Sequence, residues 1–254
     1  MPASTIATAR RALSLLDLTD LSDNADEAGL SALCVRAVAA PGPVAAICIW
    51  PRFVAQARTM LGRAPVRIAT VVNFPQGEAT GAEVLAETLG ALAAGTGEID
   101  LVLPWRAFLA GDAAAAEAMI RAVREACGGK TLKVILETGE YPDLDKVRAA
   151  SELAIAAGAD FIKTSTGKTT HSASLPAART MLEVIAESGR PVGLKPSGGI
   201  RTLADAAGYL ELADAIMGPE WARPESFRFG ASGLHQVLVD AITGAMSGQA
   251  SGSY

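Results

Sequence analysis

The stretches VRIATVV at 66–72, IDLVL at 99–103 and LKVILE at 132–137 show how this chain is built. Each is almost continuously aliphatic instead of alternating apolar with polar residues, which is typical of strands buried on both faces of a parallel sheet. Eight runs in 254 residues give about 32 residues per unit, roughly the length of a strand–turn–helix–turn module. The other five runs lie near 15–19, 44–50, 160–164, 192–195 and 227–231.

The segments between these runs carry signals for amphipathic helices. Thr80 with Glu83 matches a capping box, and Thr202 with Asp205 matches the start of another helix. Behind the first of these caps, leucines recur at helical spacing before a glycine stop: Leu85, Leu89, Leu92 and Gly95.

Eight such units in one chain predict a closed (β/α)8 TIM barrel of the α/β class. We expect a single domain over 1–243, followed by a flexible tail of small residues over 244–254. An open doubly wound sheet is the alternative, but no GxGxxG follows the first aliphatic run.

Composition narrows the functional class. Half of the residues are apolar but only 5% are aromatic, and the formal net charge is −5, which argues against a nucleic-acid binder. No apolar run approaches the roughly 20 residues of a membrane span. Three cysteines without a CxxC pair indicate a reducing compartment, so we expect a cytoplasmic protein with no membrane partner.

Charged side chains interrupt several aliphatic runs, and Lys163 and Lys195 do so near the carboxyl ends, where barrels build active sites. Asp100, Lys133, Lys163 and Lys195 all lie in such runs, although lysine and aspartate are almost never buried unless paired. A structural ion pair, such as Asp100 with Lys195, explains one lysine alone about as well as function does. For Lys163 and Lys195 we favour function, because a polar, glycine-bearing turn follows each of them.

Paired lysines suit imine formation with a carbonyl compound. A lysine with the ordinary pKa of about 10.4 is neutral in roughly one molecule in 2,500 at pH 7, and only the neutral amine attacks. Desolvation or a second cation on a neighbouring strand favours the neutral form. Asp100 is then placed to shuttle protons during carbon–carbon cleavage.

Two glycine-rich turns indicate an anion site. Gly198–Gly199 and Gly230–Ser232 each precede a predicted helix, whose N-terminal amides attract anions. Lys168 and Arg201 add positive charge nearby. A single Gly-Gly pair is more often a plain turn, but two such turns on adjacent units favour a phosphate site.

Other chemistries find little support. The two histidines, His171 and His235, lie in unrelated settings without an HExxH motif, which disfavours a metal-dependent aldol cleavage, and we expect no cofactor. Cys48 lies on a buried run and is more often a small core residue. If it faces the pocket, its thiol is vulnerable to electrophilic aldehydes.

Motifs along nearly the whole chain resemble those of the deoxyribose-phosphate aldolase family. KTSTGK with KPSGGIR is the most specific combination. The matching segments are LDLTDL at 16–21, CIWPRF at 48–53, EIDLVLP at 98–104, LKVILETGE at 132–140, DFIKTSTGK at 160–168, GLKPSGGIR at 193–201 and FRFGAS at 227–232.

The resemblance implies a metal-free class I aldolase on a (β/α)8 barrel. That family reversibly cleaves 2-deoxy-D-ribose 5-phosphate to acetaldehyde and D-glyceraldehyde 3-phosphate. It implies that Lys163 is the Schiff-base lysine, that Lys195 is the second lysine, and that Asp100 is the acid/base partner. Tyr254 resembles a C-terminal tyrosine that transfers a proton in some members. The substrate-binding residues that it implies are Asp17, Thr19, Cys48, Lys133, Thr166, Gly167, Lys168, Gly198, Gly199, Arg201, Gly230 and Ser232.

One departure from the family pattern lies beside Ser232. Gly233 stands where close relatives often carry a second serine, which removes one hydroxyl contact to phosphate but keeps the backbone N–H. The resemblance also implies a homodimer. Three alternatives stay open: an imine-forming barrel enzyme with a different sugar or keto acid, a non-catalytic phosphosugar-binding barrel, and a pyridoxal-phosphate protein.

Overall fold

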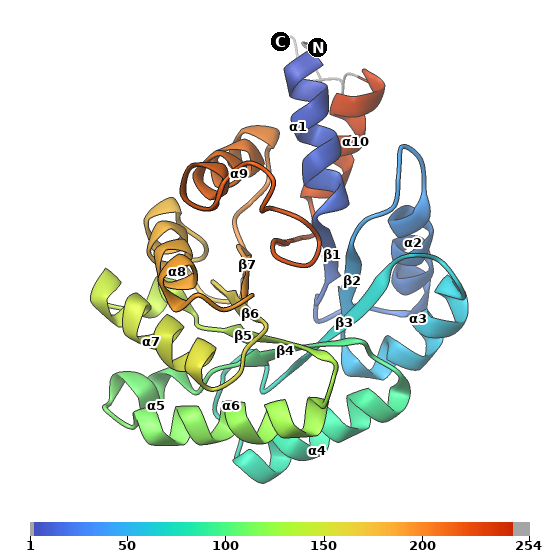
Figure 1. Ribbon diagram of the computed structural model, residues 1–254. Helices are drawn as coiled ribbons and strands as arrows, with labels where there is room; N and C mark the ends of the chain where they lie inside the picture. Colours follow the sequence, from blue (N-terminus) through green and yellow to red (C-terminus); the bar gives the residue numbers. More distant parts are fainter. Residues whose placement is uncertain (1–2, 246–254) are drawn as a thin grey trace, which may run out of the picture.

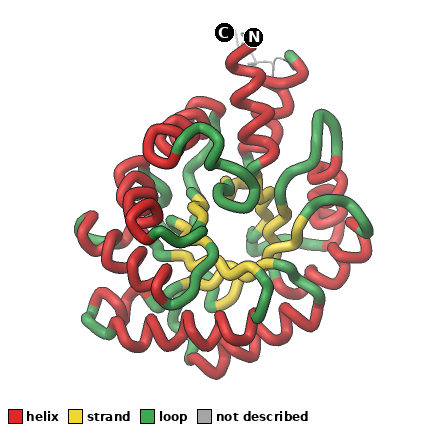
Figure 2. The backbone as a smooth tube through the Cα atoms, in the orientation of Figure 1, coloured by secondary structure: helices red, strands yellow, loops and turns green. Residues whose placement is uncertain are grey.

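The computed structural model describes residues 3–245, in which eight parallel strands form a ring inside a layer of helices (Figures 1 and 2). The strands are β1 (Leu16–Asp20), β2 (Ala46–Ile49), β3 (Arg67–Val72), β4 (Glu98–Val102), β5 (Thr131–Ile135), β6 (Phe161–Lys163), β7 (Gly193–Lys195) and β8 (Phe229–Ala231). The helices are α1 (Ala3–Ser14), α2 (Glu27–Val38), α3 (Val54–Leu61), α4 (Gly81–Ala94), α5 (Trp105–Leu109), α6 (Ala113–Cys127), α7 (Leu144–Ala156), α8 (Leu175–Ser188), α9 (Leu203–Met217) and α10 (Leu234–Thr243), with 3-10 turns η1 (Pro51–Phe53) and η2 (Thr138–Glu140).

The strand order confirms the predicted barrel. Neighbours follow one another as β7-β6-β5-β4-β3-β2-β1-β8, and every paired strand is parallel. Two bridges, Leu194 with Phe227 and Ser197 with Gly230, join β7 to the β8 segment. The ring therefore closes, which rules out the open doubly wound sheet.

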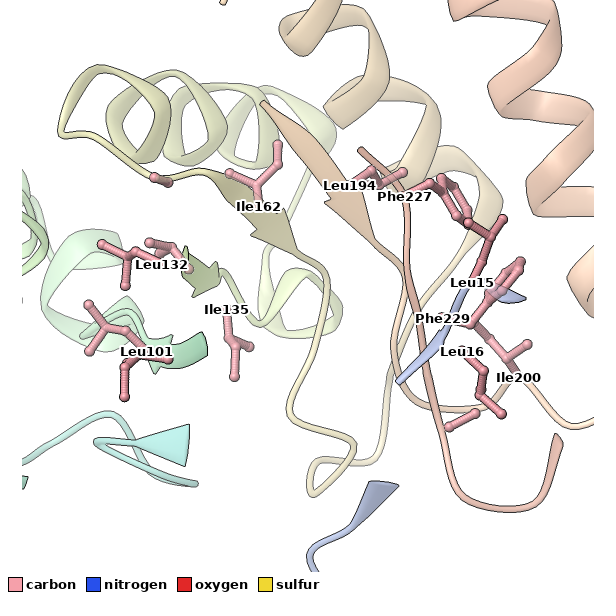
Figure 3. Packing of buried hydrophobic residues seen from close by; sticks show 14 of the residues in the cluster. Leu15, Leu16, Leu101, Leu132, Ile135, Ile162, Leu194, Ile200, Phe227 and Phe229 are labelled. Atoms are coloured by element: carbon pink, nitrogen blue, oxygen red, sulfur yellow. The ribbon is translucent and has the colours of Figure 1, made fainter. Parts of the chain in front are cut away.

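The hydrophobic core lies mainly between the strands and the helices. Outward residues such as Leu101, Leu132, Ile162 and Leu194 are fully buried there, as Figure 3 shows. Residues paired across a parallel sheet point to the same face, so the remaining strand positions face the barrel interior. This alternation sends the charged residues of the aliphatic runs inward.

The helix caps follow the sequence, but one helix face does not. Both predicted capping boxes form, at Thr80 and Thr202, and Gly95 ends α4 with a left-handed backbone. The predicted apolar face of α4 is wrong by about one residue: Val84, Thr88 and Ala91 are buried, whereas Leu89 is 52% exposed. The row of Val84, Thr88 and Ala91 faces the strands, and α4 also packs against α6.

No helix among residues 3–245 is long and apolar enough to cross a membrane.

Candidate active site

Seven charged side chains fill one side of the barrel interior, and each is at most 2% exposed. Lys163 on β6 is the direct register partner of Lys195 on β7, and Asp100 on β4 is the partner of Lys133 on β5. Paired positions point to the same face, so the register alone brings these groups together. We call this set the ionic cluster: Asp17, Glu98, Asp100, Lys133, Lys163, Lys195 and Arg228.

Asp100 lies at the centre of the ionic cluster. Its Oδ2 accepts hydrogen bonds from the Nζ of Lys163 at 2.8 Å and of Lys195 at 2.7 Å, and its Oδ1 accepts from Lys133 at 2.9 Å. Burial alone would raise the pKa of this carboxyl, but the three ammonium groups hold it well below its usual range. Asp100 is therefore a carboxylate at neutral pH, shared by both lysines of the predicted imine pair.

A second layer of charges holds Lys195 as a cation. Asp17 lies 2.5 Å from the Nζ of Lys195 and 2.6 Å from Arg228. Burial opposes the charge on Lys195, but Asp100 and Asp17 outweigh it and raise the pKa of this amine above its ordinary value. Glu98 forms ion pairs with Lys133 at 2.5 Å and with Arg228 at 2.9 Å, so both of these cations also have a carboxylate partner in this layer.

The pairing leaves Lys163 with the fewest carboxylate partners. Arg228 and Lys195 each contact two carboxylates and Lys133 contacts three, whereas Lys163 contacts Asp100 alone. The cluster holds four cations against three carboxylates, and an unmatched buried charge is costly. Lys163 is therefore the basic group of the cluster that is held by the fewest ion pairs.

A cavity of about 540 Å³ opens at the carboxyl ends of β1, β6, β7 and β8. This volume suits a small ligand. A Cβ added at Gly230 would lie 3.1 Å from Cε of Lys195, so the cavity floor touches the ionic cluster. The lining residues are Thr19, Asp20, Leu21, Ser22, Thr166, Gly167, Lys168, Ser197, Gly198, Gly199, Ile200, Arg201, Gly230, Ala231, Ser232 and Gly233.

Two helices begin at this cavity, and they differ in how they are capped. The first turn of α9 is satisfied internally, because Thr202 and Asp205 form a capping box and Asp205 also accepts from the amide of Arg201. These hydrogen bonds lower the pKa of Asp205 and keep its carboxylate charged. The N-cap of α10 is Gly233, which offers no side-chain bond. The first amides of α10 therefore remain available to an anion.

The adjoining side of the barrel interior, on β2 and β3, is apolar. Cys48 and Ala69 are register partners on β2 and β3, and they pack with Leu21 and Val71 under the edge-to-face pair of Trp50 and Phe74, whose ring centroids are 5.6 Å apart. Burial raises the pKa of the Cys48 thiol, so the thiol stays protonated. Cys48 does not line the cavity. We call this set the apolar wall: Leu21, Cys48, Trp50, Ala69, Val71 and Phe74.

The structure places the predicted site residues in two adjoining groups. Asp17, Asp100, Lys133, Lys163 and Lys195 lie in the ionic cluster. Tyr254 lies outside the described residues. Among residues 3–245, no three acidic, histidine or cysteine side chains are arranged to hold a metal ion. The predicted residues that line the cavity are Thr19, Thr166, Gly167, Lys168, Gly198, Gly199, Arg201, Gly230 and Ser232.

Three buried charged residues were not predicted as part of the site. Glu98 and Arg228 pair with the predicted residues inside the ionic cluster, and the buried Glu137 binds the backbone of the loop after β6. A charge within an aliphatic run was the signal that identified Asp100. It applies equally to Glu98 and Arg228, which lie at the edges of their runs.

The chain is similar to known aldolases in sequence and in fold. A deoxyribose-phosphate aldolase from Agrobacterium fabrum is 54% identical over 227 residues, which cover 89% of this chain and 88% of that protein. A Toxoplasma gondii ME49 structure, provisionally described as a deoxyribose-phosphate aldolase, superposes with a TM-score of 0.87 at 28% identity and covers 97% of this chain and 100% of that one. The deoxyribose phosphate aldolase from Aeropyrum pernix, described as tetrameric, shares the fold with a TM-score of 0.77 at 23% identity, covering 94% and 98%. Residues 12–251 match the model of the DeoC/LacD family aldolases, so this chain belongs to that family and is an aldolase, a carbon–carbon lyase.

Proposed function

We propose that this aldolase reversibly cleaves 2-deoxy-D-ribose 5-phosphate to acetaldehyde and D-glyceraldehyde 3-phosphate through an imine on Lys163. The observation that carries the proposal is the sharing of one carboxylate oxygen of Asp100 by Lys163 and Lys195, at 2.8 and 2.7 Å, beneath a cavity suited to an anion. The name of the Agrobacterium fabrum relative supports the choice of substrate.

The proposed reaction begins at the amine of Lys163. The neutral amine attacks the aldehyde carbon C1 of the open-chain sugar, and the resulting carbinolamine takes up a proton on its hydroxyl and loses water to give an iminium ion. A base then takes the proton of the C3 hydroxyl, and the C2–C3 bond breaks with its electron pair moving into an enamine on Lys163. C3 leaves as the aldehyde carbon of D-glyceraldehyde 3-phosphate. Protonation of the enamine at C2 and hydrolysis release acetaldehyde and restore the amine.

The ionic cluster supplies the charges that this sequence needs. Lys195 remains a cation beside the reacting nitrogen and shares one oxygen of Asp100 with it. Asp100 touches both nitrogens and stabilises the iminium ion when it forms. Because Asp100 is ionised and hydrogen-bonded to three lysines, it relays protons between these amines more readily than it holds one.

The phosphate is proposed to lie at the far end of the cavity. Gly167, Gly199 and the first turn of α10 present backbone amides there, and Lys168 and Arg201 supply positive charge. Thr19 lines the cavity on the strand that carries Asp17, and its hydroxyl donates to the Asp17 carbonyl at 2.8 Å, so we assign Thr19 to the sugar end of the cavity. The carbonyl carbon would then reach Lys163 while the phosphate stays near the solvent.

Borohydride trapping tests the imine. Reduction in the presence of acetaldehyde or the phosphorylated sugar is expected to add one adduct at Lys163 and to abolish activity, because reduction makes the carbon–nitrogen bond permanent. Lys163→Arg is the matched control, since it keeps a cation but cannot form the imine. EDTA is expected to leave the rate unchanged. No adduct, or an adduct on another lysine, defeats the proposal.

Gly233→Ser tests how the phosphate end discriminates. The added hydroxyl is expected to lower KM for the phosphorylated sugar relative to the free sugar by up to about tenfold, or about 1.4 kcal/mol, the scale of one hydrogen bond. Steady-state kinetics with both sugars measure the ratio. Equal discrimination by the two proteins rejects a phosphate contact at this position.

We further propose a cytoplasmic homodimer, as the family resemblance implies. Light scattering is expected to give a solution mass near twice the 26.0 kDa of the chain. A mass near four times that value would instead match the assembly described for the Aeropyrum pernix enzyme.

A further inference from the structure

A short turn after β5 is pressed against the loop that follows β6. The turn runs from Glu137 through η2, and Glu137 adopts a left-handed backbone with φ of 61° although it is not glycine. Such a conformation costs of order 1 kcal/mol or more and persists where surrounding contacts hold it. The hydrogen bonds of the Glu137 side chain show which contacts hold this backbone conformation.

The buried Glu137 carboxylate binds Thr166 twice. It accepts hydrogen bonds from the Thr166 amide at 3.1 Å and from Thr166 Oγ1 at 2.6 Å. The Thr166 hydroxyl in turn accepts from the amide of Lys168 at 3.0 Å. Burial raises the pKa of Glu137, and the hydrogen bonds from Thr166 oppose that rise. A relay therefore runs from a buried carboxylate through one hydroxyl to the backbone of Lys168.

Two backbone contacts fix the same loop at other points. The Thr138 amide donates to the carbonyl of Thr164 at 2.9 Å. A Cβ on Gly139 would collide with the carbonyl of His171, so only glycine permits this close approach. The turn thus holds the loop on both sides of Thr166.

The relay determines which groups the loop offers to the cavity. The amides of Thr166 and Lys168 are occupied by Glu137 and by the Thr166 hydroxyl. Gly167, between them, has a positive φ of 76° and lines the cavity, and its amide makes no hydrogen bond within residues 3–245. The Gly167 amide is therefore left without a partner among residues 3–245 at the wall of the cavity, where it can donate to an anion.

We propose that Glu137 is a positioning residue for phosphate recognition, acting through Thr166 and the Lys168 backbone to hold the Gly167 amide at the cavity. This inference rests on the proposed function, because it assumes that the cavity takes a phosphorylated substrate. A merely structural Glu137 would affect both sugars alike. A positioning Glu137 affects the phosphorylated sugar selectively.

Inorganic phosphate titrated into ¹⁵N-labelled protein, followed at the Gly167 amide, tests the proposal without any turnover. Glu137→Gln leaves one acceptor oxygen where three donors converge, namely the Thr166 amide and the hydroxyls of Thr166 and Thr169, and turns an amide group toward a donor. We expect phosphate affinity to fall at least about tenfold, the effect of losing a hydrogen bond to a charged group. KM for the phosphorylated sugar is expected to rise in parallel, while KM and kcat for free deoxyribose stay within about threefold. Glu140→Gln is the control, on the same turn and without a side-chain hydrogen bond within residues 3–245, and is expected to match wild type.

The outcomes separate this inference from the proposed function. The positioning role is wrong if Glu137→Gln binds phosphate like wild type, or if it raises KM equally for both sugars. It is also wrong if phosphate does not shift the Gly167 amide resonance of the wild-type protein. If phosphate binding depends on Glu137 but the wild type does not cleave deoxyribose 5-phosphate, the proposed function is wrong and the positioning role stands.

A second pair of variants covers the case in which Glu137→Gln does not fold. Thr166→Val removes the relay hydroxyl at nearly constant volume, whereas Thr166→Ser keeps it. Phosphate affinity is expected to fall about tenfold in the valine variant and to stay within about threefold in the serine variant. Equal affinities in the two variants would overturn the relay.

Discussion

The ionic cluster and the apolar wall fill adjoining sides of one barrel by different physical means. Strands β2 and β3 contribute Cys48, Ala69 and Val71, whose packing depends on volume alone. Neighbouring strands contribute carboxylates and cations at the same inward positions, as Val71 and Asp100 show by being register partners. The barrel thus places charge beside hydrocarbon, and each side alters what the other can do.

The apolar wall strengthens the electrostatics of the ionic cluster. Side chains such as Val71 exclude water from the barrel interior, so charges interact more strongly there than in solvent and an unpaired charge costs more. The ionic cluster is therefore expected to respond to changes of charge at constant volume and to pH. The apolar wall is expected to respond to changes of volume and to be indifferent to pH.

Asp100→Asn is expected to have the largest effect. The substitution keeps the shape but leaves Lys163 and Lys195 without their shared carboxylate, so kcat/KM should fall by about 10²–10⁴. The free energy of unfolding should fall by about 3–5 kcal/mol, as for other broken buried pairs. Steady-state kinetics and urea unfolding measure the two effects. A variant with near-normal kcat/KM would show that the cluster is structural only.

Asp17→Asn probes the pH response of the same cluster. Burial alone would raise the pKa of Asp17, but Lys195, Arg228 and Lys133 lower it in the folded state. Its stabilising contribution is therefore present above the ordinary carboxyl pKa of about 4 and is lost as pH falls below that value. We expect the variant to be about 3–5 kcal/mol less stable at pH 7 and the gap to narrow by pH 3. A gap that is constant with pH would contradict the charge-based explanation.

Val71→Ala is expected to give the smallest effect, on the apolar side. Removal of two buried methyl groups should cost about 2 kcal/mol through lost burial and the cavity left behind. Unfolding measured at pH 7 and pH 5 should show the same loss, because no titrating group is removed. A pH-dependent loss would mean that the two sides of the barrel are not separable.

The strands were predictable because burial on both faces leaves a plain trace in the sequence. The runs that contain Ile99 and Leu132 became β4 and β5 within one or two residues at either end. The face of α4 was predicted less well, because Leu85, Leu89 and Leu92 form a helical row beside the row of Val84, Thr88 and Ala91. Helical spacing alone cannot choose between neighbouring rows when space against the strands favours small side chains.

Contacts between distant segments were beyond the reach of sequence patterns. Lys163, Lys195 and Asp100 stood out as charges in apolar runs, and strand register then brings them together. The role of Glu137 depends on a left-handed backbone and on the loop after β6, neither of which a local pattern reveals. The capping of α9 by its own Asp205 and the uncapped start of α10 likewise determine which backbone amides lack a hydrogen-bond partner. Only the three-dimensional structure shows those amides.

The first turn of α10 has no side-chain cap, so a bound anion would take the place of the cap. An anion bound at Gly233 would serve as the missing cap, so occupancy should slow hydrogen–deuterium exchange in the first turn of α10. The self-capped α9 should exchange at the same rate with or without the anion. Helix α10 packs along α1 (Figure 1). Substrate occupancy would therefore also stabilise the contact between the first and the last helix of the fold.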